Sequence, residues 1–402
     1  MQYEKIRTYC ANHRKDLLPH LKTLVNISSG TTNPEGVNEV IGYCQRFLDT
    51  LGFSSKREGR PGLAANLVST SPGNHGARIL AMGHADTVFP LEQPRREFQP
   101  KQDKCFGPGV CDMKGGLVAL LCGLKALKEV TGGFPNMITV MINGDEEITS
   151  PSSKGIIKTL ALKADFGLVF EPGVSRMRVV TRRSGLTKCI LMVKGRAAHS
   201  GSKPWTGASA VRDLAEKIPR LEDLSDRERG INVNVGLIRG GMARNVVPPF
   251  AEAEIDVRFR TGQQGEELMA HIRKIAEMVD VPGTKSRLKT IHGRPPLIFT
   301  PAAMELMKLY RSIATWNGWH LSHGRAGGCS DGNFASSFGL PTLDGLGPTG
   351  GHAHSEREFI YTESLFERTL FASQILGADY MHLLSVLREM RNASRVAGGS
   401  MP

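Results

Sequence analysis

The chain has 402 residues, of which 40% are hydrophobic and 22% are charged. It is too long for one ordinary domain and too rich in apolar residues for a disordered chain, so we expect two folded domains. The formal net charge of +12 is compatible with attraction of anionic substrates into a cleft, with a nucleic-acid partner, or with a merely basic surface. Because there is no dense run of lysine and arginine and no nucleic-acid-binding motif, we expect no nucleic-acid partner.

The sequence also bears on membranes and on the redox state of the cysteines. There is no stretch of 18 or more uninterrupted apolar residues, and the mixed-charge N-terminus lacks the apolar core of a signal peptide. We therefore expect a cytoplasmic protein with no membrane partner. The seven cysteines are dispersed and form no CxxC pair, which favours reduced thiols over a disulfide framework or a cysteine zinc site.

The first part of the chain alternates between helix and strand patterns. Helices are expected over residues 3–26 and 34–52, the second with Asn33 as its cap and Pro34 in its first turn. An apolar helix pattern over 115–130 follows the first of three short apolar strands, which are Ile79–Met82, Met137–Asn143 and Phe166–Phe170. This alternation predicts an α/β fold with a mixed, mostly parallel sheet flanked by helices.

From about residue 183 the pattern changes. Alternating strand patterns occur at 186–193, 231–238 and 251–260, with helix patterns near 207–218 and 265–279, which is typical of a small α+β unit with a half-exposed sheet. The α/β pattern returns from about residue 294, with helices near 301–316 and 363–388. We therefore predict a discontinuous larger domain formed by residues 1–182 and 294–402, and a smaller domain inserted at 183–293.

Polar side chains follow the three apolar strands. His84 and Asp86 come after the first strand, Glu146 and Glu147 after the second, and Glu171 after the third. Binding sites in open α/β sheets form beyond the C-terminal ends of the strands, so we expect these side chains to lie close together.

Two glycine-rich segments add further candidates, Asp112 in residues 107–116 and His354 in residues 350–355. Several carboxylates gathered at a buried edge would repel one another, and a pair of divalent cations would remove that repulsion. Imidazole and carboxylate ligands suit zinc, with manganese or cobalt as substitutes. Such a pair would activate a water between them and polarise a substrate carbonyl. Each residue alone has an ordinary alternative, such as a helix cap for Asp112, and it is their joint order that indicates a metal centre.

At this point several ordered segments identify a family. They are residues 83–88, 107–116, 145–147, 170–172, 195–201, 245–248 and 354–355. On these segments the chain resembles, from about residue 15 to 390, the dizinc aminoacylase/carboxypeptidase metallopeptidase family. That family includes acetylornithine deacetylase, succinyl-diaminopimelate desuccinylase and glutamate carboxypeptidase. Residues 328–333 and 341–347 are most similar to the glutamate carboxypeptidase-like branch.

The resemblance implies a zinc-peptidase-like catalytic domain that holds two zinc ions. Asp112 would bridge both ions, His84 and Glu171 would complete one site, and Glu147 and His354 would complete the other.

The resemblance also implies roles around the metals. Glu146 would be the general base that deprotonates the water and later protonates the leaving nitrogen. Asp86 would orient the ring of His84, and the peptide bond after Asp112 is cis in family members. His354 is assigned as the ligand, and not His352, because the residues that follow it match the family spacing.

In family members the inserted domain forms the homodimer, and the histidine that matches His199 reaches the partner's active site to hold the oxyanion. Asn245 and Arg258 match positions that bind the carboxylate end of the substrate, and Arg294 resembles an arginine that recognises a glutamate side chain. The ordinary alternatives are a turn residue for His199, a solvated strand residue for Arg258 and a hinge charge for Arg294.

Together these features predict a metal-dependent hydrolase that releases a C-terminal amino acid, preferably glutamate, from a small N-acyl or peptidyl amide bearing a carboxylate. Two alternatives keep the metals but change the substrate, namely an N-acyl amino acid deacylase and an aminohydrolase acting on a different amine. A third is a catalytically dead dimeric binding protein, which the complete ligand set and Glu146 disfavour.

Overall fold

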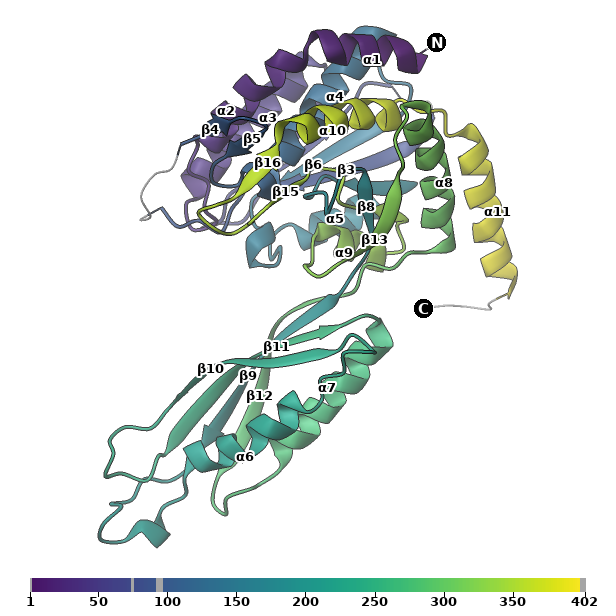
Figure 1. The fold of residues 1–402 in the computed structure, drawn as a ribbon. Helices are drawn as coiled ribbons and strands as arrows, with labels where there is room; N and C mark the ends of the chain where they lie inside the picture. The colour runs from purple at the N-terminus through teal and green to yellow at the C-terminus, as the bar shows by residue number, and fades with distance from the viewer. Residues whose placement is uncertain (1, 74–75, 92–96, 398–402) are drawn as a thin grey trace. The chain divides into compact units, whose positions relative to one another are not determined.

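The computed structural model describes residues 2–73, 76–91 and 97–397 (Figure 1). The chain divides into two compact units. The first consists of Met1–Arg182, Leu297–Ala326 and Ser330–Pro402, and the second of Arg183–Pro296 with Gly327–Cys329.

The first unit is built on a six-stranded sheet in the order β1-β2-β6-β3-β7-β14. The strands are β1 Ser54–Glu58, β2 Asn66–Thr70, β3 Arg78–His84, β6 Met137–Asn143, β7 Phe166–Val169 and β14 Thr342–Leu343. The central strand β3 pairs in parallel with β6 and β7, and β7 pairs in parallel with β14, whereas β1 and β2 add an antiparallel edge. The prediction of a mixed, mostly parallel sheet is confirmed.

Helices cover both faces of this sheet. They are α1 Gln2–Asn12, α2 Leu17–Val25, α3 Pro34–Thr50, α4 Gly115–Thr131, α5 Lys154–Ala161, α8 Pro301–Trp316, α9 Asp331–Ser337, α10 Thr362–Leu376 and α11 Met381–Ala397. Successive residues of β3 point to opposite faces, so Ile79 joins the large cluster with α1, α4 and α10, while Leu80 joins a smaller cluster with α5 and α9. This three-layer arrangement buries β3 on both sides and fixes the position of its C-terminal end.

The core helices α4 and α10 pack directly against each other. A Cβ added at Gly123 of α4 would lie 3.0 Å from the Cβ of Ala372 and 3.1 Å from the backbone of Ser373, so glycine permits this close approach.

No single helix in the described ranges is long and apolar enough to span a membrane. The helix α10 and the start of α11 meet that test only as a pair, which is bent by 70°.

The predicted cap of α3 is confirmed, because the side chain of Asn33 accepts the N–H of Gly36. Two long predicted helices, in contrast, are interrupted. The helix expected over 3–26 breaks after Asn12 and resumes at Leu17. Pro19 explains the break, because a continuous helix would place its ring against the carbonyl four residues earlier. The helix expected over 363–388 ends at Leu376 and resumes at Met381 after a turn that begins at Gly377.

Two small sheets complete the first unit, one of four strands and one of two. The four-stranded sheet contains β4 Gln99–Lys101, β5 Lys104–Phe106, β15 Gly350–Gly351 and β16 Phe359–Tyr361, in the order β15-β16-β5-β4. The two-stranded sheet pairs β8 Arg178–Arg183 with β13 Ser322–Ala326. The pairing of β16 with β5 joins two segments that carry candidate ligands nearby.

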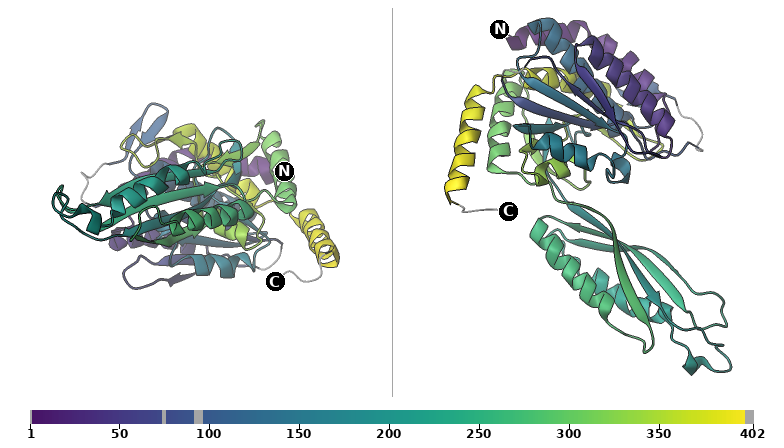
Figure 2. Two further views of the ribbon diagram at one scale, coloured as in Figure 1. Left: turned by 90° about the horizontal axis from the view of Figure 1, so that it is seen from below. Right: turned by 180° about the vertical axis from the view of Figure 1, so that it is seen from behind.

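The second unit is an antiparallel sheet with helices on one face. Its strands β9 Gly185–Lys194, β10 Asn232–Gly240, β11 Phe250–Phe259 and β12 Lys285–Arg294 lie in the order β10-β11-β9-β12. The helices α6 Ala210–Glu222 and α7 Gly262–Glu277 run side by side along this sheet (Figure 2). Burial alternates along β11, as expected for a sheet that is covered on one face only. The strand β12 was not predicted, because its sequence is interrupted by basic residues.

A cluster of buried charges lies at α6 in the second unit. The side chains of Asp213 and Lys217 are fully buried and form an ion pair, and Lys217 Nζ also lies 2.9 Å from Asp280 Oδ2. Asp213 Oδ2 accepts the N–H of Val281 at 3.1 Å and the hydroxyl of Thr284 at 2.7 Å. Asp213 therefore ties α6 to the segment that precedes β12.

Replacing Asp213 by alanine should lower the free energy of unfolding by about 3 kcal/mol or more, because it leaves a buried ammonium group and buried donors without their main acceptor. Urea denaturation monitored by circular dichroism measures this. The matched control is Asp223→Ala at the exposed end of the same helix, which should change stability by less than about 0.5 kcal/mol. Equal denaturation midpoints for the two variants would show that the cluster contributes little.

Candidate metal centre

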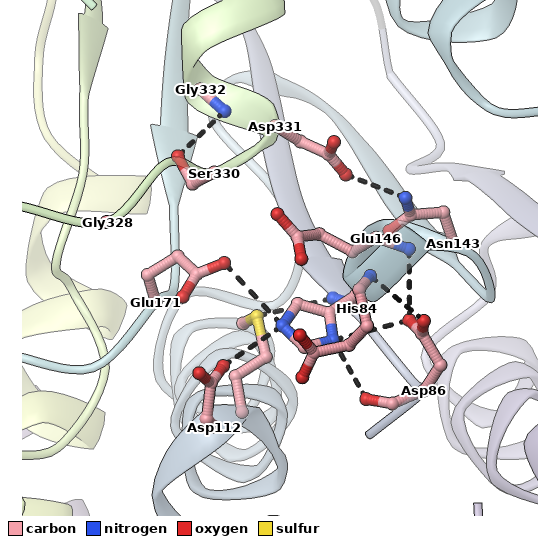
Figure 3. A network of polar contacts seen from close by, with 12 residues as sticks. His84, Asp86, Asp112, Asn143, Glu146, Glu171, Gly328, Ser330, Asp331 and Gly332 are labelled. Atoms are coloured by element: carbon pink, nitrogen blue, oxygen red, sulfur yellow. Dashed lines mark hydrogen bonds and ion pairs between the residues drawn. The ribbon is translucent and has the colours of Figure 1, made fainter. Parts of the chain in front are cut away.

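The candidate ligands of the first unit gather at the C-terminal edge of the parallel strands, and Figure 3 shows His84, Asp112 and Glu171 among them. His84 is the last residue of β3, and Glu146 and Glu147 form a short turn three residues after β6. Glu171 lies two residues after β7. Since β3 pairs in parallel with both β6 and β7, these three segments end at the same edge.

The carboxylate of Asp112 lies between two histidines. Its Oδ1 is 3.1 Å from Nε2 of His84, and its Oδ2 is 3.1 Å from Nε2 of His354. Each histidine has a further carboxylate at 3.6 Å, from Glu171 beside His84 and from Glu147 beside His354. The five predicted ligands therefore form two groups that share Asp112.

The residues present fit the binding of divalent cations. Donor atoms about 2.0–2.1 Å from a tetrahedral zinc ion are roughly 3.4 Å apart, which is close to the separations found here. Donor atoms of His84, Asp112 and Glu147 lie within 4.8 Å of one another. The buried Oε1 of Glu147 accepts no hydrogen bond from the described residues, so this oxygen is available to a cation.

Crowding of these groups shifts their proton affinities. Burial, the Asp112 carboxylate and the Glu146 carboxylate raise the pKa of Glu147 to about 8. The hydrogen bond with Asp112 raises the pKa of His354 to about 9. Although burial acts in the opposite direction, hydrogen bonds with Asp112 and Asp86 raise the pKa of His84 well above its usual range. Bound metal ions would compete with protons for these same donor atoms.

Asp86 is fully buried and contacts both parts of the centre. Its backbone oxygen is 2.9 Å from Nδ1 of His84 and its Oδ1 is 3.4 Å from the same nitrogen, which assigns the proton to Nδ1 and turns Nε2 toward Asp112. Its carboxylate also accepts the N–H groups of Glu146 at 3.2 Å and Glu147 at 3.1 Å. The resemblance implied the contact with His84 but not the two contacts with the turn.

The turn that carries Asp112 has an unusual backbone. The peptide bond between Asp112 and Met113 is cis, as the resemblance implies, and Gly109 has a φ of 70°. A Cβ at Gly109 would lie 2.6 Å from Thr87, so glycine is needed there.

The family of the chain follows from comparison with known proteins. Residues 80–377 match the model of peptidase family M20/M25/M40. The chain belongs to this family. It is therefore an M20 metallohydrolase, and the carboxylate and histidine cluster lies within the matched region.

Relatives of this M20 protein include carboxypeptidases and deacetylases. It is 29% identical to carboxypeptidase G2 of Pseudomonas sp. (strain RS-16), over 89% of this chain and 87% of that protein. It is 26% identical to acetylornithine deacetylase of Proteus mirabilis (strain HI4320), over 86% and 91% of the two chains. The crystal structure of a tripeptidase from Staphylococcus aureus has the same fold, with a TM-score of 0.76 and 24% identity over 94% of this chain and 99% of that chain.

The second unit of the M20 chain contains His199 and Asn245 on neighbouring segments. The N–H of Ser200 donates to the backbone oxygen of Asn245 at 3.0 Å, and both His199 and Asn245 are exposed. Nδ1 of His199 accepts the N–H of Gly201 at 3.1 Å. In the neutral ring the proton therefore lies on Nε2, which leaves an N–H group free to donate.

The two predicted arginines occupy one row of the sheet of the second unit. Arg258 on β11 and Arg294 on β12 are both register partners of Leu186 on β9. Arg258 forms two contacts with the carboxylate of Asp256, at 2.8 and 3.2 Å. Arg294 is buried and lines a cleft of about 360 Å³ whose other wall includes the start of α7.

Proposed function

We propose that this M20 protein is a dizinc hydrolase that cleaves an amide bond and releases a C-terminal amino acid, glutamate by preference, from an N-acyl or peptidyl substrate. The observation that carries the proposal is the placement of Asp112 between His84 and His354, each with its own glutamate. This is the donor set for two adjacent cations, with manganese or cobalt as alternatives to zinc. The similarity to carboxypeptidase G2 supports the choice of a carboxypeptidase.

Glu146 performs the proton transfers in this proposal. Two bound cations would polarise the scissile carbonyl and lower the pKa of the attacking water. Glu146 accepts the proton of that water and returns it to the leaving nitrogen. Its backbone N–H is held by Asp86 and it precedes the ligand Glu147, so the base and the metal ligand are positioned by one turn.

The arginines of the second unit support a leaving group with two carboxylates. Arg258 and Arg294 lie on the two strands that flank Leu186 of β9, so their backbones are two strand spacings, roughly 10 Å, apart. Glutamate carries an α-carboxylate and a side-chain carboxylate, and each of them would take an arginine as its partner. In this assignment Arg258 and Asn245 bind the α-carboxylate and Arg294 binds the side chain.

We further propose a cytoplasmic homodimer that pairs through the second unit. The edge strand β10 exposes 51% of Leu237 and 58% of Ile238, which is an apolar edge that a second copy would cover. All seven cysteines lie in the described ranges and none of them is in a disulfide, which suits a reducing compartment. The exposed Nε2–H of His199 would donate to the oxyanion in the partner's site.

Hydrolysis of an amide panel by zinc-loaded enzyme, with and without chelator, tests the substrate assignment. The panel varies the C-terminal residue over Glu, Asp, Ala, Leu and Arg under one acyl group, and adds an aromatic amine that lacks a carboxylate. Chelator-sensitive preference for Glu is the expected result. Preference for an N-acyl amino acid of another kind would favour the deacylase alternative, which the similarity to acetylornithine deacetylase supports.

Mixing two inactive variants tests the dimer. Neither His199→Ala nor Glu146→Gln should turn over substrate alone, because one removes the oxyanion donor and the other removes the base. After subunit exchange, one site of each hybrid dimer combines an intact Glu146 with the intact His199 of the partner subunit. About half of the dimers are hybrids, and each hybrid has one intact site of two. Activity should therefore return to roughly a quarter of the wild-type value. Failure to recover activity after exchange has been verified by mass spectrometry would contradict the arrangement.

A further inference from the structure

A buried carboxylate outside the ligand set, that of Glu358, binds the turn that carries Asp112. Glu358 is 1% exposed and lies four residues after His354. Its Oε2 accepts the N–H of Gly109 at 3.0 Å, and its Oε1 accepts the N–H groups of Cys111 at 2.8 Å and Asp112 at 2.9 Å. Three backbone donors of one short turn therefore converge on a single side chain.

The first and last residues of the segment 354–358 thus both contact Asp112. The ring of His354 contacts the side chain of Asp112, and the carboxylate of Glu358 contacts its backbone N–H. The same segment leads directly into β16, which pairs with β5 just before the turn begins. The position of the shared carboxylate relative to His354 is therefore set within one stretch of five residues.

We propose that Glu358 is a positioning residue for the metal centre, fixing the backbone of the Asp112 turn so that the shared carboxylate meets both cations. The proposal rests on the proposed function for the identity of the ligands. Three N–H donors on two oxygens require a carboxylate, because a glutamine would set its own amide N–H₂ against one of these donors. A carboxylate beside Asp112 also adds to the repulsion within the cluster, and bound cations would offset that repulsion.

The far end of the same turn has its own anchor. Lys114 is 1% exposed, and its ammonium group donates to the backbone oxygen of Ile27 at 2.8 Å. Loss of the Glu358 contacts should therefore loosen the end that bears Asp112 and leave the remainder of the turn in place.

The test compares Glu358→Gln with Glu356→Gln, an exposed residue two positions away that loses the same charge. Zinc affinity is measured by competition with a chromophoric chelator, the coordination by the visible spectrum of the cobalt-substituted protein, and folding by the unfolding midpoint of the metal-free protein. We expect Glu358→Gln to weaken zinc binding about 10- to 100-fold and to alter the cobalt spectrum, and the control to bind within about twofold of wild type. Glu358→Asp keeps the charge but is one methylene shorter, so it should also weaken binding and remains informative if the glutamine variant does not fold.

A folded Glu358→Gln protein with wild-type zinc affinity and an unchanged cobalt spectrum would overturn the proposal. So would a variant whose metal-free form is destabilised while its zinc affinity stays at the wild-type value, since that result assigns Glu358 to folding alone. These readouts do not require turnover. If the wild-type protein binds two zinc ions but hydrolyses no amide, the proposed function fails while the inference about Glu358 is still decided by the binding data.

Discussion

Replacing Glu146 by glutamine is expected to lower kcat by about 1000-fold, which is within the usual contribution of a positioned acid–base group. Glutamine has the same size but cannot accept and return a proton. Glu146 is not among the five ligands, and its backbone contact with Asp86 is independent of its side chain, so zinc content and thermal stability should remain at wild-type values. Steady-state kinetics together with metal analysis of the same sample measure both quantities.

The exposed Glu356→Gln variant is the control for the loss of one negative charge, and it should retain full activity. A Glu146→Gln enzyme with wild-type kcat would show that another group carries the proton. A loss of zinc that parallels the loss of activity would show instead that Glu146 is a ligand.

Replacing Asp112 by asparagine is expected to remove both cations, whereas His354→Ala should remove only one. Asp112 places one carboxylate oxygen beside His84 and the other beside His354. Asparagine keeps only one of these oxygens and has an amide nitrogen in place of the other, so it cannot serve both positions. We expect zinc affinity to fall by at least about 100-fold and kcat/KM by at least about 1000-fold. In His354→Ala the group of His84, Asp112 and Glu171 stays intact and should keep one zinc ion per chain.

His352→Ala is the matched control for His354→Ala. His352 is an exposed histidine two residues earlier, and its ring lies 6.0 Å from that of Phe359. Metal analysis should give two zinc ions for this variant and one for His354→Ala. The reverse pattern would mean that the ligand was assigned to the wrong histidine.

The sequence predicted the strands that carry the centre because their signals are local. Met137–Asn143 is a continuous apolar run bounded by polar residues, and the strand β6 has these same bounds. Parallel pairing then places the residues after β3, β6 and β7 at one edge, so the grouping of His84, Glu147 and Glu171 followed from the fold class.

The contacts that hold the ligands could not be read from local patterns. Asn143 ends an apolar strand, yet its buried amide donates to Asp331 at 2.7 Å across 188 positions of the chain. The carboxylate of Glu358 accepts hydrogen bonds from a turn that lies 246 to 249 positions earlier in the chain. A single buried carboxylate or amide gives no sequence signal of its partner, and such partners are known only when the fold brings the segments together.

The boundaries of the second unit show a related limit. Gly327–Cys329 is separated from Arg183–Pro296 in the sequence but belongs to the same unit. Within that unit Arg258 donates to the backbone oxygen of Gly327 at 3.3 Å and Arg183 to that of Gly328 at 3.1 Å. Backbone acceptors can be supplied by any residue type, so the sequence gives no indication of this association.

Stepwise return of zinc to chelator-treated protein tests the two-metal account most directly. Amide hydrolysis and bound zinc are measured at each addition. The metal-free enzyme should be inactive, and activity should rise until about two zinc ions are bound per chain. Full turnover in metal-free protein, or activity that saturates at one bound ion, would contradict a centre in which Asp112 joins two cations.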